Sequence, residues 1–279
     1  MRRHVTFDCA GDMLFGTLDE AGGNIGLLIV SGGNEIRSGA HSGQAAMATH
    51  FAALGHPVFR YDRRGIGDSE GCNGGFETTC DDIAAAIAKF RSEASHVTKI
   101  VVFGNCDAAS ALALFHAGLP IDMLALANPW VIEAEAPETE TGTGAGDDAP
   151  TKPSAAAIRA RYWARIKNPR SLIDLFTGKV DLRKLIGGLA KAAQKEAPTA
   201  LAGRLADALA ATEKPVHILL AARDTTALAF IGAWKDTVFA EARARGNIRA
   251  HELDSASHSF ADDQSKAWLE EQLAVLLRG

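Results

Sequence analysis

A short apolar run that ends beside a cysteine is the feature that most constrains the fold. Residues Ile100 to Phe103 are β-branched or aromatic, which predicts a fully buried strand. The run stops at Gly104, and the Ala/Leu-rich stretch 108–117 predicts a helix directly after it. Cys106 is therefore expected in a tight turn between a central strand and a helix.

The turn around Cys106 has the pattern of a nucleophile elbow, Gly104-x-Cys106-x-Ala108, with a thiol in place of the usual serine hydroxyl. Small flanking residues are needed because the nucleophile's backbone is strained and bulkier neighbours would collide with the strand or the helix. The dipole of the following helix favours a thiolate, whereas the carboxylate of Asp107 disfavours one. The alternative role for Cys106 is that of a small buried apolar residue at a strand end.

The rest of the chain predicts an α/β fold with a mostly parallel, doubly wound sheet and a helical cap insertion. A hairpin comes first and strands alternating with helices follow it. Strands are expected over 3–9, 13–19, 25–30, 57–61, 100–103, 121–127, 216–221 and 248–253. Helices are expected over 43–54, 76–91, 108–117 and 229–244, and as an amphipathic segment at the end of the chain.

A change in composition after residue 132 predicts the insertion. Residues 133–153 are rich in Glu, Thr, Gly, Pro and Asp, which predicts a mobile acidic loop. Helical patterns without a strand continue to residue 212. We therefore expect a core formed by 1–130 and 213–279, with a helical cap over 131–212.

Composition also narrows the classes of function. The chain has 279 residues, a net charge of −5 and a pI near 6.0, which gives no indication of a nucleic-acid partner. It contains no apolar run long enough for stable membrane insertion and lacks the apolar region of a signal peptide. Four cysteines without a Cys-x-x-Cys pair predict a cytoplasmic protein with reduced thiols and with neither a metal nor a cofactor. The oligomeric state is not indicated.

Three reactive groups are expected at the carboxyl ends of strands, where open α/β sheets bind ligands. Cys106, Asp224 and His258 follow one another in the order nucleophile, acid and histidine. In this interpretation His258 accepts the thiol proton and later activates water, while Asp224 orients the imidazole. The alternatives are an N-cap role for Asp224, a helix-capping role for His258, and Asp254 as the acid.

An oxyanion hole requires two backbone N–H groups directed at the developing negative charge. We expect one from Asp107 and the other from the loop after strand 25–30, at Gly33 or Asn34. An ordinary glycine turn is the alternative for this loop.

Three side chains are candidates for substrate binding. Arg37 and His41 belong to the same loop, and Trp130 follows the strand 121–127. Arg37 and His41 have the alternative roles of anchoring the loop or capping the next helix.

Together these segments resemble the α/β-hydrolase superfamily over both core segments. Residues 62–69, Asp-Arg-Arg-Gly-Ile-Gly-Asp-Ser, are similar to that superfamily's Asp-x-Arg-Gly-x-Gly-x-Ser loop. A closer resemblance is to the type 1 subfamily of exosortase A system-associated hydrolases. It is carried by Gly32, Gly33, Arg37, Gly39, His41, 59–71, 104–110, 128–130, Tyr162 and Arg165.

That resemblance implies a bacterial cytoplasmic hydrolase linked to exopolysaccharide production and to the sorting of surface proteins. The elbow cysteine is also similar to that of dienelactone hydrolases, which use a Cys-Asp-His triad. The long insertion departs from their compact form.

The complete triad favours an enzyme that acts on a small acyl substrate. Cys106 would attack an ester or thioester, and water would release the acyl group from the acyl-enzyme. Acyl transfer to a sugar hydroxyl is the variant in which another acceptor replaces water. A non-catalytic protein that binds a polysaccharide precursor or a protein partner is the alternative class.

Overall fold

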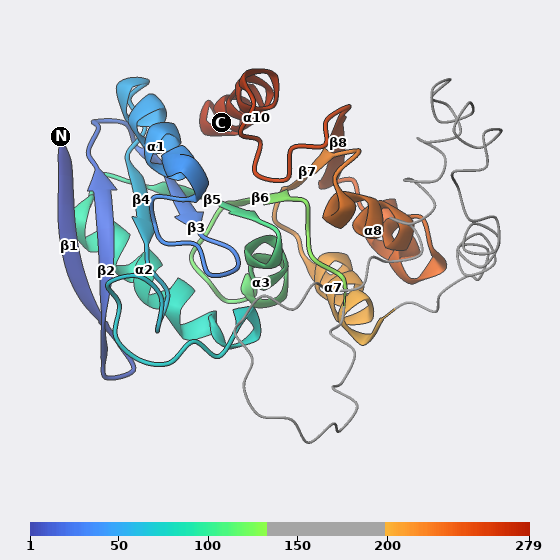
Figure 1. Ribbon diagram of the computed structural model, residues 1–279, viewed down its shortest axis with the longest axis horizontal. Coiled ribbons are helices and arrows are strands. Elements are labelled where there is room, and N and C mark those ends of the chain that lie inside the picture. Colours follow the sequence, from blue (N-terminus) through green and yellow to red (C-terminus); the bar gives the residue numbers. More distant parts are fainter. Residues whose placement is uncertain (133–198) are drawn as a thin grey trace, which may run out of the picture.

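The computed structural model describes residues 1–132 and 199–279, whose strands form a single sheet (Figure 1). The strands are β1 (Arg2–Cys9), β2 (Asp12–Asp19), β3 (Ile25–Val30), β4 (Val58–Tyr61), β5 (Lys99–Asn105), β6 (Met123–Ala127), β7 (Val216–Ala221) and β8 (Ile248–Leu253). Their order across the sheet is β1-β2-β4-β3-β5-β6-β7-β8. The pairs β1–β2 and β2–β4 are antiparallel and all other described pairs are parallel.

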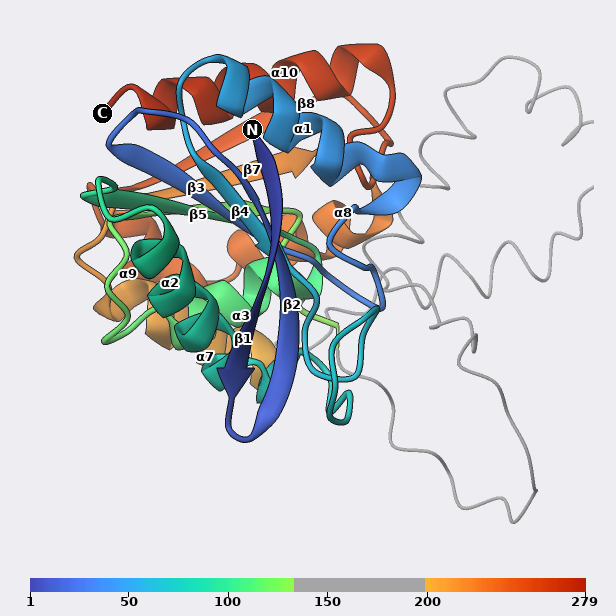
Figure 2. The same ribbon diagram turned by 90° about the vertical axis from the view of Figure 1, so that its left-hand side faces the viewer.

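Helices cover both faces of the sheet, as Figure 2 shows. The described helices are α1 (Gly43–Ala53), α2 (Cys80–Glu93), α3 (Asp107–Phe115), α7 (Ala200–Ala211), α8 (Thr225–Trp234), α9 (Ala240–Ala244) and α10 (Asp263–Leu277). Short 3-10 turns are η1 (Ala40–Ser42), η2 (Phe76–Thr78) and η3 (Thr237–Phe239). Residues of α1 and α10 form the core on one face, while α2, α3, α7, α8 and α9 contribute to the core on the other.

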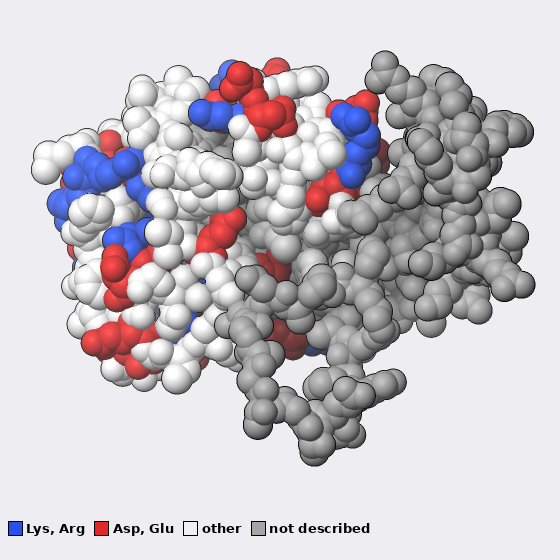
Figure 3. All heavy atoms as spheres, in the orientation of Figure 1, with Lys and Arg blue, Asp and Glu red and all other residues white. Residues whose placement is uncertain are grey.

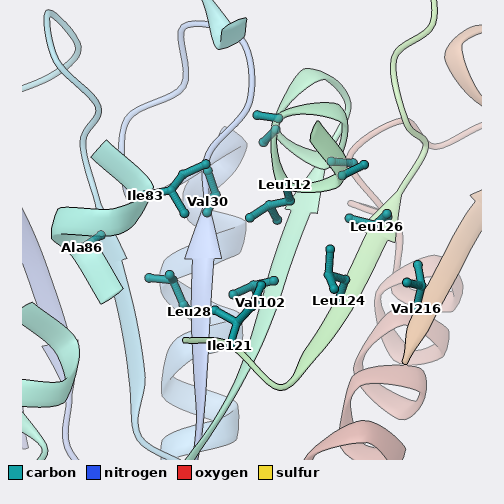
Figure 4. Packing of buried hydrophobic residues seen from close by; sticks show 14 of the residues in the cluster. Leu28, Val30, Ile83, Ala86, Val102, Leu112, Ile121, Leu124, Leu126 and Val216 are labelled. Carbon is teal, nitrogen blue, oxygen red and sulfur yellow. The ribbon is translucent and has the colours of Figure 1, made fainter. Parts of the chain in front are cut away.

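The central strands are buried on both sides because their alternate residues enter the two core clusters. On β3, Leu28 belongs to one cluster and Leu27 to the other. In register, Leu28 lies beside Val102 of β5, which lies beside Leu124 of β6 (Figure 4). This explains why the parallel strands are continuous apolar runs rather than alternating ones.

The element predictions are largely confirmed, with two exceptions, at 76–91, where η2 precedes α2, and at 229–244. The hairpin, the parallel strands and the elbow helix are present at or within a few residues of their expected bounds. The single helix expected over 229–244 is instead α8, η3 and α9. The helix begins earlier because Asp224 caps it, and Asp236 starts a new turn by capping η3.

The predicted boundary of the cap needs a correction. Most of the expected cap, including the acidic loop 133–153, lies outside the described residues. Helix α7, however, was expected in the cap and packs against α3 and α9 in the main core. Its apolar side chains, such as Leu205 and Leu209, are about 1% exposed, so the core resumes before residue 213.

Charged side chains of both signs are interspersed on the described part of the face seen in Figure 3. None of the described helices is long and apolar enough to cross a bilayer.

The buried row across the sheet predicts a specific stability difference. Leu28 has no exposed surface, whereas Leu54 at the end of α1 is 56% exposed. Leu28→Ala should lower the free energy of unfolding by roughly 2–5 kcal/mol because it leaves a cavity. Leu54→Ala, the matched control, should change it by less than about 0.5 kcal/mol. Urea unfolding of both variants measures this, and equal losses would contradict the described packing.

Candidate active site

Cys106 joins β5 to α3 with a strained backbone. Its φ is 62° and its ψ is −128°, a conformation that costs a non-glycine residue on the order of 1–3 kcal/mol. The Cys106 N–H donates to the carbonyl of Ala127 (3.0 Å), and the Trp130 N–H donates to the carbonyl of Cys106 (3.3 Å). The end of β6 and the segment after it therefore hold the turn in this conformation.

Close packing of the strand against the helix explains the small residues around the cysteine. A Cβ atom on Gly104 would lie 2.8 Å from the carbonyl carbon of Ala108 and 2.9 Å from Leu112 Cδ1. Ala108 itself is 1% exposed. The departure from glycine at this position is therefore accommodated, whereas a side chain at Gly104 is not.

His258 lies after β8 and contacts Asp224, which lies after β7. The His258 Nδ1 and Asp224 Oδ2 atoms are 3.0 Å apart. The same Asp224 oxygen accepts hydrogen bonds from the N–H groups of Thr226 and Ala227, each at 3.0 Å. Asp224 thus caps α8 and contacts the histidine at once, so its N-cap role does not exclude a role as the partner of His258.

Cys106 lies close to His258, because the side-chain amide of the preceding residue, Asn105, donates to the His258 carbonyl at 3.2 Å. The bonds to Asp224 and to Cys106 raise the pKa of His258 from its ordinary 6.5 to about 10, against the opposing effect of burial. Burial would raise the pKa of Asp224, but the bonds from His258 and from the two backbone N–H groups hold it below its ordinary value. At neutral pH the arrangement is therefore an imidazolium beside a carboxylate.

Asp254, the second candidate for the acid, lies in a different environment. Its side chain is 87% exposed and forms an ion pair with Arg223 Nε at 2.8 Å. The geometry therefore favours Asp224 as the partner of His258.

Two asparagines that we did not predict as site residues hold the histidine loop. The side-chain amides of Asn105 and Asn128 donate to the backbone carbonyl of His258 at 3.2 and 3.1 Å. Asn128 also accepts the N–H of Ala221 at 2.9 Å, which ties β7 to the same point. The position of each asparagine at a strand end is the only signal in the sequence, and it does not specify these partners.

The loop after β3 lies against Asp107. A Cβ on Gly32 would lie 2.5 Å from the carbonyl oxygen of Asn105 and 2.7 Å from Asp107 Oδ1, so this contact requires glycine. The Gly33 N–H donates to Asp107 Oδ1 at 2.6 Å. The side chain of Asp107 therefore accepts the N–H group that we expected to face a substrate. Asn34, next in the loop, accepts a bond from the Asn73 amide through Oδ1 (2.9 Å).

Arg37 is placed as an anchor of this loop, which corrects its assignment as a substrate-binding residue. Its guanidinium pairs with Asp62 and Asp68 and donates to Thr17. Asp62 is fully buried and accepts the Arg37 backbone N–H as well. A Cβ on Gly67 would lie 2.4 Å from Asp62 Oδ2, which explains the glycine in the segment 62–69. The anchoring alternative considered for Arg37 is therefore the one that the contacts favour.

The other two substrate-binding candidates differ in exposure. His41 lies in η1 with a φ of 51° and is exposed. Trp130 is half-buried against the core, and its backbone carbonyl accepts the Ser110 hydroxyl at 2.6 Å. Its N–H bond to Cys106 makes Trp130 part of the support of the elbow.

Glu35 is a further site residue that sequence reasoning missed. Its carboxylate accepts the Gln44 side-chain amide at 3.3 Å. Burial raises the pKa of Glu35, and the negative charge of Asp107 adds to this while His258 opposes it. Glu35 is thus a partly buried carboxyl group whose charge interacts with that of His258, and no local pattern in the sequence indicates it.

Comparison with known proteins agrees with this geometry. Residues 27–271 match the model of the "Alpha/beta hydrolase family". The structure is similar to an esterase from Pyrococcus furiosus, with a TM-score of 0.63 and 13% identity over 99% of this chain and 92% of that one. It is also similar to an esterase from Thermogutta terrifontis (TM-score 0.57, 16% identity, 99% and 98% covered). An alpha/beta hydrolase from Sphaerobacter thermophilus is similar as well (0.53, 21%, 96% and 100%).

No curated protein matches the chain. At these identities the solved structures show the fold alone, whereas the family match spans most of the sequence. The sheet order, the strained turn after β5 and the family match lead to one conclusion: the chain belongs to the alpha/beta hydrolase family.

Proposed function

We propose that this alpha/beta hydrolase cleaves a carboxylic ester or thioester with Cys106 as its nucleophile. The observation that carries the proposal is the strained Cys106 turn at the same edge of the sheet as the hydrogen-bonded pair His258–Asp224, with Asn105, the residue before the cysteine, bonded to the His258 carbonyl. A binding protein has no need of a strained cysteine beside a histidine–carboxylate pair. The two esterases among the structural neighbours support an ester as the bond that is cleaved.

Acylation begins with an imidazolium at His258 and requires the thiolate form of Cys106, because the thiolate is the nucleophilic form of cysteine. His258 is protonated at neutral pH because its pKa is about 10, so Cys106 has a cationic partner. The thiolate attacks the carbonyl carbon, and the π electrons move to the oxygen. When the tetrahedral intermediate collapses, the leaving alkoxide or thiolate takes the proton of His258. The acyl group remains on Cys106 as a thioester.

Deacylation reverses the proton movement. Once the sulfur is acylated, its contribution to the raised pKa of His258 is lost, so the neutral imidazole persists more readily. The imidazole takes a proton from water as the water oxygen attacks the thioester. Collapse releases the carboxylic acid and restores the thiolate and the imidazolium. Asp224, bonded to Nδ1, leaves Nε2 for these transfers.

The N–H groups of Asp107 and of the Gly33–Asn34 loop are our candidates for the oxyanion hole. In the free protein the Gly33 N–H donates its hydrogen bond to the Asp107 carboxylate. A substrate oxygen must therefore replace that carboxylate in order to use this donor. His41 and Trp130 remain the candidates for contacts with the rest of the substrate.

The biological setting is proposed from sequence resemblance. The glycine loop at 32–33, the segment 59–71 and the elbow 104–110 resemble type 1 exosortase A system-associated hydrolases. On this basis the enzyme acts in the bacterial cytoplasm on a small acylated molecule connected with exopolysaccharide production.

A comparison of cysteine variants tests the proposed function. On a panel of p-nitrophenyl esters and acyl thioesters, Cys106→Ala should lower kcat/KM by at least about 10³-fold because the nucleophile is lost. Cys80→Ala is the matched control, since Cys80 is an exposed free thiol at the start of α2, and it should retain wild-type rates. Equal rates in wild type and Cys106→Ala would exclude Cys106 as the nucleophile.

Titration of His258 tests whether Asp224 or Asp254 is the acid of the triad. The folded pKa is raised, so the ring should stay protonated through neutral pH and lose its proton only as the pH rises through about 10. Asp224→Asn removes the largest cause of this shift and should move the NMR midpoint of the His258 ring towards 6.5. Asp254→Asn, the matched control, should leave the midpoint in place. A shift in the control rather than in Asp224→Asn would reverse the assignment.

A further inference from the structure

Arg63, directly after β4 and Asp62, is a buried cation that has no carboxylate partner among the described residues. It is 3% exposed. Its Nη2 group donates to the backbone carbonyl of Gly33, whereas its Nε and Nη1 atoms are buried without a hydrogen-bond partner. Other arginines of this region all contact carboxylates: Arg37–Asp62, Arg60–Asp19 and Arg64–Asp82. A buried charge without a partner is unfavourable unless a negative charge develops nearby.

The charge of Arg63 lies next to the candidate oxyanion hole, because its guanidinium is hydrogen-bonded to Gly33. The Gly33 carbonyl accepts a hydrogen bond from the Arg63 guanidinium, and the Gly33 N–H donates one to Asp107 Oδ1. One residue and two hydrogen bonds thus separate the guanidinium from the carboxylate beside Cys106. Arg63 is therefore a cation on the far side of the Gly33 peptide from the Asp107 carboxylate.

The same bond fixes the orientation of the next peptide. The Gly33 carbonyl and the Asn34 N–H belong to one planar trans peptide and point in opposite directions. Because Arg63 holds the carbonyl, the Asn34 N–H is directed away from Arg63. This N–H group donates to no described residue, so it is available to a ligand.

We propose that Arg63 is a positioning residue of the oxyanion hole. It holds the Gly33–Asn34 peptide in place, and its charge stabilises the anion that occupies the hole, first the Asp107 carboxylate and then the oxyanion of the tetrahedral intermediate. The catalytic half of this statement rests on the proposed function. The positioning half rests on the contacts of Gly33 alone.

The first experiment measures positioning and needs no substrate. Hydrogen exchange of the Gly33 amide, followed by NMR, should be at least about tenfold faster in Arg63→Gln than in wild type. The reason is that the loop loses its anchor and the Asp107 carboxylate loses the neighbouring cation. Arg223→Gln is the matched control: it removes the same charge from an exposed site at the same edge of the sheet and should leave the Gly33 rate unchanged. An unchanged Gly33 rate in Arg63→Gln would overturn the proposal whether or not the protein is an esterase.

The second experiment separates a catalytic consequence from general damage. Arg63→Gln should slow acylation by esters about 10²-fold, with a smaller loss in Arg63→Lys, which keeps the charge. Alkylation of Cys106 by iodoacetamide should change by less than about threefold, because that reaction forms no oxyanion. Parallel losses in acylation and alkylation, or wild-type acylation in Arg63→Gln, would overturn the oxyanion role.

Two further outcomes are also decisive. If Arg63→Gln does not fold, acylation and alkylation are measured on Arg63→Lys instead. Slower acylation with unchanged alkylation supports the proposal, and wild-type acylation overturns it. If the wild-type protein turns over no ester, the proposed function fails, while the exchange rate of Gly33 still decides whether Arg63 positions the loop.

Discussion

The strained backbone of Cys106 is the constraint on which the site depends. A φ of 62° turns the chain sharply enough to start α3 directly behind the sulfur. Such a conformation persists only where the surroundings over-determine it. Here the supports are two hydrogen bonds, one to Ala127 and one from Trp130, and the close contact between Gly104 and Ala108. Sheet and helix packing thereby place the thiol at the carboxyl edge.

Residues around the thiol act on several elements at once, which makes the site rigid. Asp224 caps α8 and binds His258 through one oxygen. Asn128 joins β7 to the loop that carries His258. Asp62 binds both the backbone and the side chain of Arg37. His258 is therefore held by neighbours that are themselves hydrogen-bonded to the backbone, as a preorganised site requires.

Local patterns in the sequence predict most of the fold. The apolar run of β3 predicts a strand buried on both faces, because such a strand has apolar residues at successive positions. The alternating pattern of β1 and β2 predicts strands buried on one face only. The elbow and the order of Cys106, Asp224 and His258 are predictable for a related reason: each residue directly follows or lies near a strand end. The extent of the cap was misjudged because α7 has the same amphipathic pattern whether it covers the core or an insertion.

Contacts between loops could not be predicted in the same way. Whether Arg37 faces a ligand or Asp62 depends on how the loop after β3 packs against the loop after β4. The residue pattern of either loop does not predict this packing. The same holds for Glu35, for the bond between Asp107 and Gly33, and for the burial of Arg63. In each case the residue type shows a charge, but the partner that decides its role lies in another segment of the chain.

The central claim is that Cys106 carries the acyl group, and intact-protein mass spectrometry tests it most directly. The protein is mixed with p-nitrophenyl esters and acyl thioesters, quenched in acid after a short time, and weighed together with Cys106→Ala. The account predicts a wild-type mass increase equal to the acyl group, located on the peptide that contains Cys106 and absent from the alanine variant. Turnover with no adduct on Cys106, or an adduct that persists in Cys106→Ala, would contradict it.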